Sequence, residues 1–461
     1  MSTDSHCEDL TRWFYKSVPF RWNKIAFEFS LSHALFSSDR IDTGSTALLS
    51  VLEKQLYGST KHGTPAGGQP GTSAPDEGLR QPGDTPAGGA RPAPAVWKRV
   101  YDIGCGAGVL GIVAGKGLGA HEIILEDRDS LAVALSGLNA KHNGVGDRVS
   151  LCPRPTGAAE VVACDLVVCN LPAKATEEVQ RLMLRHGAGS VAGGGLFLVV
   201  VVNTLADSVH TVLTELDPTV VRHPFREHTV FVARPEAPGS TTGDRPDSET
   251  HKAHGRISHD PPPSELDLPD AYHGEKRAFT QGSIHYHLTT IHGLGEFDTP
   301  SFTNRMLTRL TAERCAGKHV LLFESGPGHV CTALQSLPKT SRPASIIVAA
   351  RNTLAGLATT RINSKWRDTR TFHVTETPLQ LTGLLEDGMC VVLPLEPEPY
   401  TPLLDEVSRL ASAIAEAGGT LILAGRSGAI SEFERYKHPL SASRKTRSRG
   451  VRGLVLDSHP A

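Results

Sequence analysis

Residues 99–112, RVYDIGCGAGVLGI, decide the fold of this chain. A short apolar run leads into Asp102, and glycines follow at alternate positions, Gly104, Gly106 and Gly108. Glycines after a strand let the backbone turn tightly and approach a ligand closely. Because a helix-like apolar pattern starts directly after them, the stretch predicts a strand, a glycine turn and a helix, as in a parallel doubly wound sheet. The spacing is G-x-G-x-G, which differs from the dinucleotide-binding G-x-G-x-x-G.

The residues that follow extend this pattern and supply an acid. The apolar run 122–127, EIILED, ends at Asp127, which lies 25 residues after Asp102. In sheets of this type an acid roughly 20 residues further on binds the hydroxyls of a ribose. Short β-rich runs then continue to alternate with helix-like stretches. The predicted strands are 100–104, 122–127, 165–170 and 195–202, and the predicted helices are 109–116, 130–141 and 177–184.

An internal repeat indicates that this pattern occurs twice. Five blocks recur in the same order: 37–52 in 293–310, 99–112 in 319–333, 123–140 in 346–363, 166–173 in 390–397, and 193–201 in 418–426. Five blocks in one order favour a tandem duplication. We therefore predict an α/β fold with two tandem Rossmann-like domains, each built on a doubly wound, mostly parallel sheet.

Two segments of low complexity set the domain limits. Residues 59–95 contain no Ile, Val, Phe, Tyr or Trp, and residues 236–270 are rich in Pro, Ser and Asp. Such compositions bury too little apolar surface to offset chain entropy, so we expect both to be disordered. The first is predicted to be an insert in a first domain, 1–235. The second is predicted to be a linker to a second domain, 271–461.

The motif DIGCGAGVLG with the later LED resembles class I S-adenosylmethionine-dependent methyltransferases. The preceding LFSSDRIDTGSTALL is similar to the lead-in of the "methyltransferase small" group, which includes duplicated ribosomal RNA guanine-N2 methyltransferases. The resemblance implies S-adenosylmethionine as cofactor. It implies that Asp102, Gly104 and Gly106, with Gly108 in the same loop, bind the methionine side, and that Asp127 binds the ribose.

The same resemblance implies a reaction motif after the family's fourth strand, which corresponds to the predicted strand 165–170. The family pattern is Asn-Pro-Pro-aromatic, and this chain has Asn170-Leu171-Pro172-Ala173. Asn170 and Pro172 are therefore the catalytic candidates. An Asn oxygen and a backbone carbonyl would orient a planar amine. Since the stacking aromatic is missing, Phe36 on the lead-in is a candidate replacement. The alternative is a strand-end Asn-x-Pro turn without a catalytic role.

Other positions depart from the family pattern. The run 150–160, SLCPRPTGAAE, corresponds to the end of the family's third strand, where an acid or amide commonly binds the adenine amine, and it has neither before Glu160. In the second half Leu322 and Glu324 replace Asp102 and Gly104, while Ala350 and Pro394 replace Asp127 and Asn170. A carboxylate at a glycine position would crowd the cofactor. We therefore predict that the second domain is a degenerate copy that binds no S-adenosylmethionine.

Charge and cysteine usage bear on partners and location. The formal net charge is −2, so any nucleic-acid surface must be local. Two basic stretches are candidate nucleic-acid surfaces. The first is Arg444–Arg452, for which the alternative is a solvated loop. The second is the aromatic-rich stretch 12–24, for which the alternative is a core-facing segment. The first residues contain acids and no apolar core, so we expect no secretory signal, no membrane partner and a cytoplasmic location. Cysteine spacing predicts no metal site, and His285 and His287 are weak metal candidates.

These observations predict an S-adenosylmethionine-dependent enzyme that methylates an exocyclic amine. The resemblance favours N2 of guanine in ribosomal RNA, with ribosomal RNA as a candidate partner and ribosomal RNA processing as the role. Two alternatives stay open. One is a protein or small-molecule N-methyltransferase, and the other is a catalytically inactive RNA-binding or assembly protein. The sequence does not fix the oligomeric state.

Overall fold

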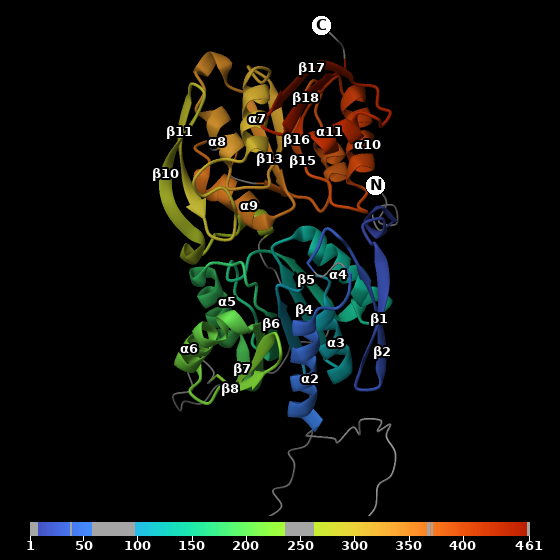
Figure 1. Ribbon diagram of the computed structural model, residues 1–461, viewed down its shortest axis with the longest axis vertical. Helices are drawn as coiled ribbons and strands as arrows, with labels where there is room; N and C mark the ends of the chain where they lie inside the picture. Colours follow the sequence, from blue (N-terminus) through green and yellow to red (C-terminus); the bar gives the residue numbers. More distant parts are fainter. Residues whose placement is uncertain are drawn as a thin grey trace, which may run out of the picture.

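The structure is a computed structural model that describes residues 8–36, 39–57, 97–235, 262–366, 369 and 372–458. The predicted insert 59–95 and residues 236–261 of the predicted linker lie outside the described residues. Two sheets lie one above the other along the longest axis of the molecule (Figure 1). The chain completes the lower, first domain before it enters the upper, second domain.

The first sheet has seven strands in the order β5-β4-β3-β6-β7-β9-β8. Five strands are parallel, and β9 and β8 form an antiparallel edge. This confirms the predicted doubly wound, mostly parallel sheet. The strands are β3 (Arg99–Ile103), β4 (Glu122–Asp127), β5 (Val149–Pro153), β6 (Cys164–Asn170), β7 (Val191–Val202), β8 (Val221–Pro224) and β9 (His228–Ala233).

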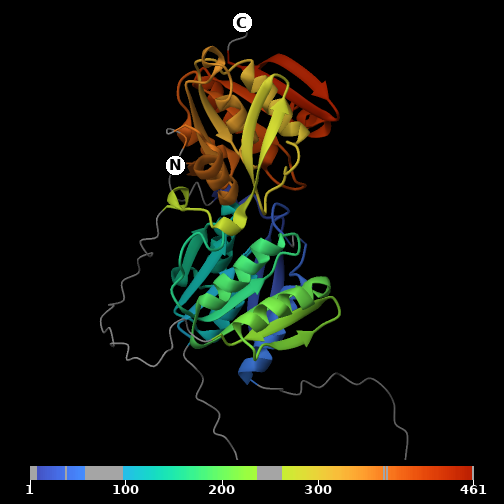
Figure 2. The ribbon, with the colours of Figure 1, turned by 90° about the vertical axis from the view of Figure 1, so that its left-hand side faces the viewer.

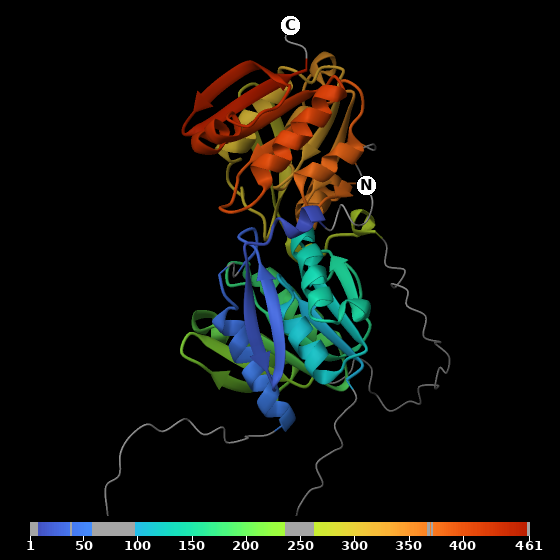
Figure 3. The same cartoon turned by 90° about the vertical axis from the view of Figure 1, so that its right-hand side faces the viewer.

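Helices cover both faces of this sheet because its central strands are apolar on both sides. In β7, Phe197 and Val199 pack into one cluster with α5 and α6, and Leu196 and Leu198 pack into the other with α2, α3 and α4. Figure 2 shows α5 and α6 in green on the first face, and Figure 3 shows α2 in blue on the opposite face. The helices are α2 (Thr43–Tyr57), α3 (Val109–Leu118), α4 (Ser130–His142), α5 (Glu177–Gly189) and α6 (Ala206–Leu216).

The second sheet repeats this topology with the order β14-β13-β12-β15-β16-β18-β17. The repeated order confirms the tandem duplication. Its strands are β12 (His319–Phe323), β13 (Ser345–Ala350), β14 (Phe372–Val374), β15 (Cys390–Leu395), β16 (Thr420–Arg426), β17 (Ser441–Ser448) and β18 (Val451–Asp457). The helices are α7 (Phe302–Ala312), α8 (His329–Gln335), α9 (Thr353–Leu357), α10 (Leu403–Glu416) and α11 (Ser427–Phe433).

A two-stranded hairpin precedes each sheet and is part of the duplication. The first pairs β1 (Lys16–Trp22) with β2 (Ile25–Leu31), and the second pairs β10 (His273–Gln281) with β11 (Ile284–Ile291). In the first hairpin Trp22 is buried against α3 and donates its Nε1–H to the carbonyl of Leu49 at 3.0 Å. Trp22 of this basic, aromatic stretch therefore faces the core.

Part of the predicted linker differs from its prediction. Residues 262–270 contain a 3₁₀ turn, Pro263–Glu265, and the start of a second, Asp270–Tyr272. Leu266 and Leu268 are buried in the larger apolar core. The prediction of disorder rested on the prolines and acids of this stretch. Burial of two leucines at alternate positions is enough to anchor it.

No helix in the described part of the chain is long and apolar enough to cross a membrane. Within the same residues no group of three or more His, Cys, Asp or Glu side chains is arranged to hold a metal ion.

Candidate functional site

The predicted site residues gather at the carboxyl edge of the first sheet. In the parallel register Ile103 pairs with Glu126 of β4 and with Cys169 of β6. The residues one step further along are Gly104, Asp127 and Asn170. The glycine turn therefore lies between the proposed ribose acid and the proposed catalytic amide. Ligands of doubly wound sheets bind at this edge.

The glycine turn is shaped to receive a ligand. Gly104, Gly106 and Gly108 have φ angles of 70°, 53° and 82°, in the left-handed region that favours glycine. A Cβ atom on Gly106 would meet no atom within 4 Å, and one on Gly104 would meet only Cε of Met183, at 4.0 Å. A Cβ on Gly108 would lie 2.8 Å from Cδ1 of Ile112. The first two glycines thus border open space, whereas Gly108 allows close helix packing.

Asp102 fixes the turn to helix α3. The side chain is 1% exposed, and its Oδ2 accepts a hydrogen bond from the backbone N–H of Gly111 at 2.8 Å. Burial raises the pKa of Asp102 to about 7. A Cβ on Gly111 would come within 2.9 Å of Cβ of Asp102, so this contact requires a glycine in the helix. Asp102 therefore shapes the floor of the proposed methionine site.

Asp127 completes the other wall of the turn. Its Oδ2 accepts from the N–H of Gly106 at 3.1 Å, and its Oδ1 accepts from the N–H of Asp129 at 2.9 Å. Burial raises the pKa of Asp127, and the neighbouring charge of Asp129 adds to this. Each carboxylate oxygen has a second lone pair, so the hydroxyls of a ribose can still be accepted. The open turn and this acid together fit the predicted cofactor, S-adenosylmethionine.

Asn170 is oriented by the lead-in segment. Its Nδ2 donates to Oδ1 of Asp42 at 3.0 Å and to Oγ of Ser45 at 3.3 Å. A carboxylate can only accept, so the amide nitrogen must face Asp42 and the amide oxygen points away from it. Asp42 also accepts from the N–H of Ser45 at 2.8 Å, at the start of α2. The amide oxygen of Asn170 is thereby left to accept from a substrate.

Sequence reasoning missed the role of Asp42 and Ser45. The signal was the Asp-Thr-Gly-Ser pattern ahead of a helical run, which is typical of a helix N-terminus. In the rest of the reaction motif, the backbone carbonyl of Pro172 already has a partner, because it accepts a hydrogen bond from Nε2 of Gln180 at 3.1 Å. Phe36 is 80% exposed on the connection from β2 to α2, so its ring is free to stack.

The end of β5 carries an arginine that sequence reasoning overlooked. Arg154 Nε donates to Glu126 Oε2 at 2.8 Å, and the two side chains are 6% and 0% exposed. Burial raises the pKa of Glu126, although Arg154 opposes the shift. Nearby, burial lowers the pKa of His186 to about 4. The buried acid Glu126 directly precedes Asp127, so this ion pair supports the edge that carries the proposed ribose acid.

The corresponding turn of the second domain is filled by the protein's own side chains. The backbone N–H of Glu324 donates to the carbonyl of Ala349 at 2.8 Å, as Gly104 does to Glu126 at 2.9 Å. Oε1 of Glu324 accepts from the N–H of Gly326 at 2.8 Å. A Cβ on Gly326 would lie 3.5 Å from carboxylate oxygens of both Glu296 and Glu324. The space that is open above Gly106 is therefore occupied here.

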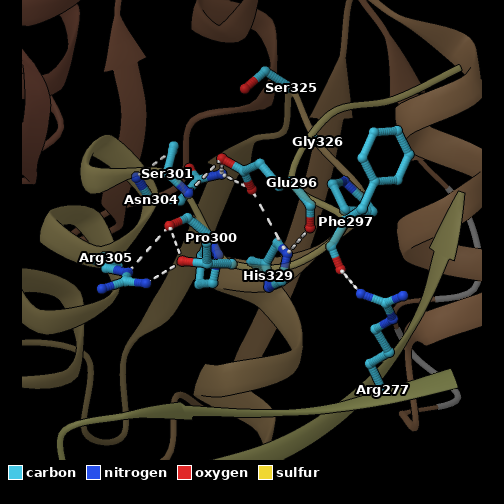
Figure 4. A network of polar contacts seen from close by, with 12 residues as sticks. Arg277, Glu296, Phe297, Pro300, Ser301, Asn304, Arg305, Ser325, Gly326 and His329 are labelled. Atoms are coloured by element: carbon cyan, nitrogen blue, oxygen red, sulfur yellow. Dashed lines mark hydrogen bonds and ion pairs between the residues drawn. The ribbon is translucent and has the colours of Figure 1, made fainter.

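Hydrogen bonds hold Glu296 in that space (Figure 4). Its carboxylate accepts from Nδ2 of Asn304 at 2.9 and 3.0 Å and from the N–H of Ser301 at 2.9 Å. His329, at the start of α8, lies with Nε2 3.2 Å from the carbonyl of Glu296. This network supports the prediction that the second turn holds no S-adenosylmethionine.

The basic stretch near the C-terminus is a strand pair, not a solvated loop. Arg444 and Lys445 lie on edge strand β17, Arg452 lies on β18, and Arg449 lies at the turn between them. Acids from distant segments neutralise part of the charge. Arg444 pairs with Glu313, and Lys445 and Arg452 pair with Glu434 at 2.8 and 3.0 Å.

The second basic stretch contributes to contacts between the domains. Trp13 is 2% exposed and donates its Nε1–H to Glu406 of α10 at 2.7 Å. Arg12 pairs with Asp405 of the same helix at 2.8 Å. The alternative of a core-facing segment is therefore correct for Trp13 and Trp22, while Tyr15 of the same stretch is 39% exposed.

Comparisons with known proteins agree with this geometry. Residues 95–199 match the family model described as ribosomal protein L11 methyltransferase (PrmA). The chain is 38% identical over 128 residues to the ribosomal protein L11 methyltransferase of Aeromonas hydrophila subsp. hydrophila, covering 27% of this chain and 42% of that protein. It is 40% identical over 126 residues to the one of Enterobacter sp., covering 27% and 41%. The chain thus spans about two fifths of these relatives.

A likeness of fold extends over nearly the whole chain. It covers 97% of this chain and 99% of the T. thermophilus 16S rRNA guanosine-N2 methyltransferase RsmC, solved in complex with AdoMet and guanosine, with a TM-score of 0.55 and 14% sequence identity. The sheets and the glycine turn had indicated the same architecture. The chain therefore has the fold of the class I S-adenosylmethionine-dependent methyltransferases, built twice in tandem, and its first copy carries the sequence features of that family.

Proposed function

We propose that the first domain binds S-adenosylmethionine and transfers its methyl group to an amine nitrogen. The observation that carries this proposal is the position of Asn170. Its amide nitrogen is held by Asp42 and Ser45, and it lies one strand away from an open glycine turn with Asp127 on the far side. When bound, S-adenosylmethionine supplies an electrophilic methyl group on a sulfonium sulfur.

The protein's contribution is to position the two reactants. The Oδ1 atom of Asn170 accepts an N–H of the incoming amine, which aims the nitrogen lone pair toward the glycine turn. Gly104 and Gly106 admit the cofactor because no side chain covers them. Asp127 binds its ribose and sets its register along the edge. In this account residues 1–235 are the catalytic unit and residues 271–461 support it.

Guanine N2 of ribosomal RNA is the substrate that we favour. The support is the tandem architecture, which is shared over nearly the full length with a 16S rRNA guanosine-N2 methyltransferase. A protein amine is the second candidate, because the sequence matches of residues 95–199 are to ribosomal protein L11 methyltransferases. With either substrate, we propose a cytoplasmic location and ribosomal material as the partner.

Methyl transfer to ribosomal material tests the proposal and separates the two substrates. The full-length protein is incubated with unmodified ribosomal subunits and cofactor labelled in its methyl group, and the label is then measured in RNA and protein fractions. We expect label in RNA, at guanine, and roughly 100-fold slower labelling with the Asn170→Ala variant. Label in protein alone would replace RNA by the second candidate. RNA binding without transfer to either fraction would indicate an inactive assembly protein.

A further inference from the structure

The two domains meet through the same turn of each copy. Ser130 of α4 donates its backbone N–H to the carbonyl of Arg351 at 3.0 Å, and Thr353 of α9 donates its N–H to the carbonyl of Arg128 at 2.8 Å. The hydroxyls of Ser130 and Thr353 repeat these two bonds, each at 2.9 Å. Both turns directly follow the position of the ribose acid, which is Asp127 in the first domain and Ala350 in the second. The interface thus lies next to the proposed cofactor site.

The two arginines of this interface differ in what they hold. Arg128 donates to the carbonyl of Gly293 at 2.7 Å, and Arg351 donates to the carbonyl of Ala34 at 2.8 Å, so these contacts are equivalent. Arg351 makes an additional bidentate ion pair with Asp129, with Nε–Oδ1 and Nη2–Oδ2 distances of 2.8 and 2.6 Å. The two side chains are 21% and 28% exposed. A bidentate, mostly buried pair of this kind fixes orientation as well as position.

Asp129 connects this ion pair to the ribose acid. Its backbone N–H donates to Oδ1 of Asp127 at 2.9 Å, and its own Oδ1 accepts from the N–H of Leu131 at 3.1 Å, capping α4. The other oxygen of Asp127 holds Gly106 of the glycine turn. A continuous set of contacts therefore runs from Arg351 in the second domain to the glycine turn of the first domain.

We propose that Arg351 is a positioning residue for the cofactor site of the first domain, acting through Asp129 on Asp127. The inference rests on the proposed function, because it assumes that Asp127 binds S-adenosylmethionine. The degenerate domain then has a defined task. It has lost its own ribose acid at Ala350, and the next residue completes the site of the other copy.

A general effect on domain packing has to be separated from this specific one, and the chain offers a matched control. Arg409 of α10 also makes an ion pair across the interface, with Asp9 at 2.8 Å, and its side chain is 43% exposed. Asp9 belongs to the N-terminal segment and has no contact with the Asp127 turn among the described hydrogen bonds. Arg409→Ala therefore removes an interdomain charge pair without touching the proposed set of contacts.

Calorimetric titration of the full-length protein with S-adenosylmethionine measures the effect. We expect Arg351→Ala to weaken binding about tenfold, the size of a typical coupling between sites. Arg351→Lys should recover part of the loss, since lysine restores the charge but not the bidentate geometry. Arg409→Ala should bind as the wild type does. Equal affinity of Arg351→Ala and wild type would overturn the inference, and so would equal losses in Arg351→Ala and Arg409→Ala.

A double-mutant cycle tests the route through Asp127. If Arg351 acts by holding this acid, Arg351→Ala should change affinity less than about twofold in a protein that already carries Asp127→Ala. A full, additive loss in that background would show that Arg351 acts elsewhere and would overturn the route. A wild type that does not bind S-adenosylmethionine would instead refute the proposed function itself.

Discussion

Asn170 and Asp127 lie on either side of one glycine turn, but their contacts imply different tasks. Asn170 is held through its nitrogen, which leaves its oxygen for a substrate, while Asp127 grips the turn itself. One should act in the transfer step and the other in cofactor binding. The two variants described next are designed to separate these steps.

Asn170→Ala should leave the affinity for S-adenosylmethionine nearly unchanged and lower turnover by roughly 100-fold. The reason is that the lost oxygen orients the amine and does not reach the ribose side. Calorimetry and single-turnover methyl transfer measure the two quantities. Asn203 is a matched control, because it directly follows the adjacent strand β7 and its amide is engaged by backbone carbonyls. Activity of Asn170→Ala equal to that of Asn203→Ala would remove Asn170 from catalysis.

Asp127→Ala should weaken binding of the cofactor by about 1.5–3 kcal/mol, as expected for the loss of a charge-assisted hydrogen bond. Glu122 lies at the opposite end of the same strand and pairs with Arg99 at 2.8 Å, so Glu122→Ala is the control. It should bind normally. If both variants lose affinity alike, the effect comes from the strand and not from the ribose contact.

The residues that orient the site were harder to predict than the site itself. Asp127, Asn170 and the glycines stand at fixed offsets from strands, so the sequence pattern was enough to nominate them. Asp42 reaches Asn170 across 128 residues, and Arg154 turns inward to a buried acid. Contacts of this kind depend on how segments pack, which no local pattern encodes.

At the scale of elements, the two glycine turns differ in whether side chains fill the space above them. In the first copy Asp127 accepts the N–H of Gly106, and in the second copy Glu324 accepts the N–H of Gly326 from within the turn. Glu324 thus takes the hydrogen-bond role that Asp127 has in the first turn, and together with Glu296 it occupies the space above Gly326. The crowding predicted from the sequence at Glu324 is thus explained by the structure.

Glu324 should make stability depend on pH. Burial raises its pKa to about 8 from an ordinary value of 4.5, so the folded protein keeps a proton that the unfolded chain releases. The stabilisation is complete below pH 4.5 and is lost as pH rises toward 8, by at most about 1.4 kcal/mol per pH unit. Urea unfolding of wild type and Glu324→Gln at pH 5, 6, 7 and 8 tests this. The free energy of unfolding of the variant should rise relative to that of the wild type at each step in pH. A difference that stays constant from pH 5 to pH 8 would contradict the raised pKa of Glu324.

Strands and helices of the sheet layers were predictable because they follow strong apolar runs. The predicted strand 122–127 and helix 130–141 agree with β4 and α4 to within a residue. The two hairpins were not predicted, since β1, KSVPFRW, mixes charges with apolar residues and has a proline. This segment is a strand because it pairs with β2 and because Trp22 is buried.

At the scale of the whole molecule, ion pairs on strands β17 and β18 leave only part of their positive charge available for RNA. Arg447 and Arg449 have no ion pair among the described residues, whereas Arg444 and Lys445 are paired with acids. If RNA binds here, Arg447→Ser with Arg449→Ser should flatten the salt dependence of affinity by about 1.4–1.8 in the log–log slope, or two phosphate contacts. Arg444→Ser with Lys445→Ser should flatten it less. Filter binding of ribosomal RNA across a salt series measures the two slopes. Equal flattening in both double variants would refute the distinction between paired and unpaired basic residues.

The central claim is that one chain has one cofactor site, in the first domain. Calorimetry of the full-length protein with S-adenosylmethionine measures it directly as the number of molecules bound. We expect one molecule per chain, a value that stays at one in Glu324→Gln, and a binding signal that Asp127→Ala strongly weakens. Two molecules per chain, or undiminished binding after Asp127→Ala, would contradict it.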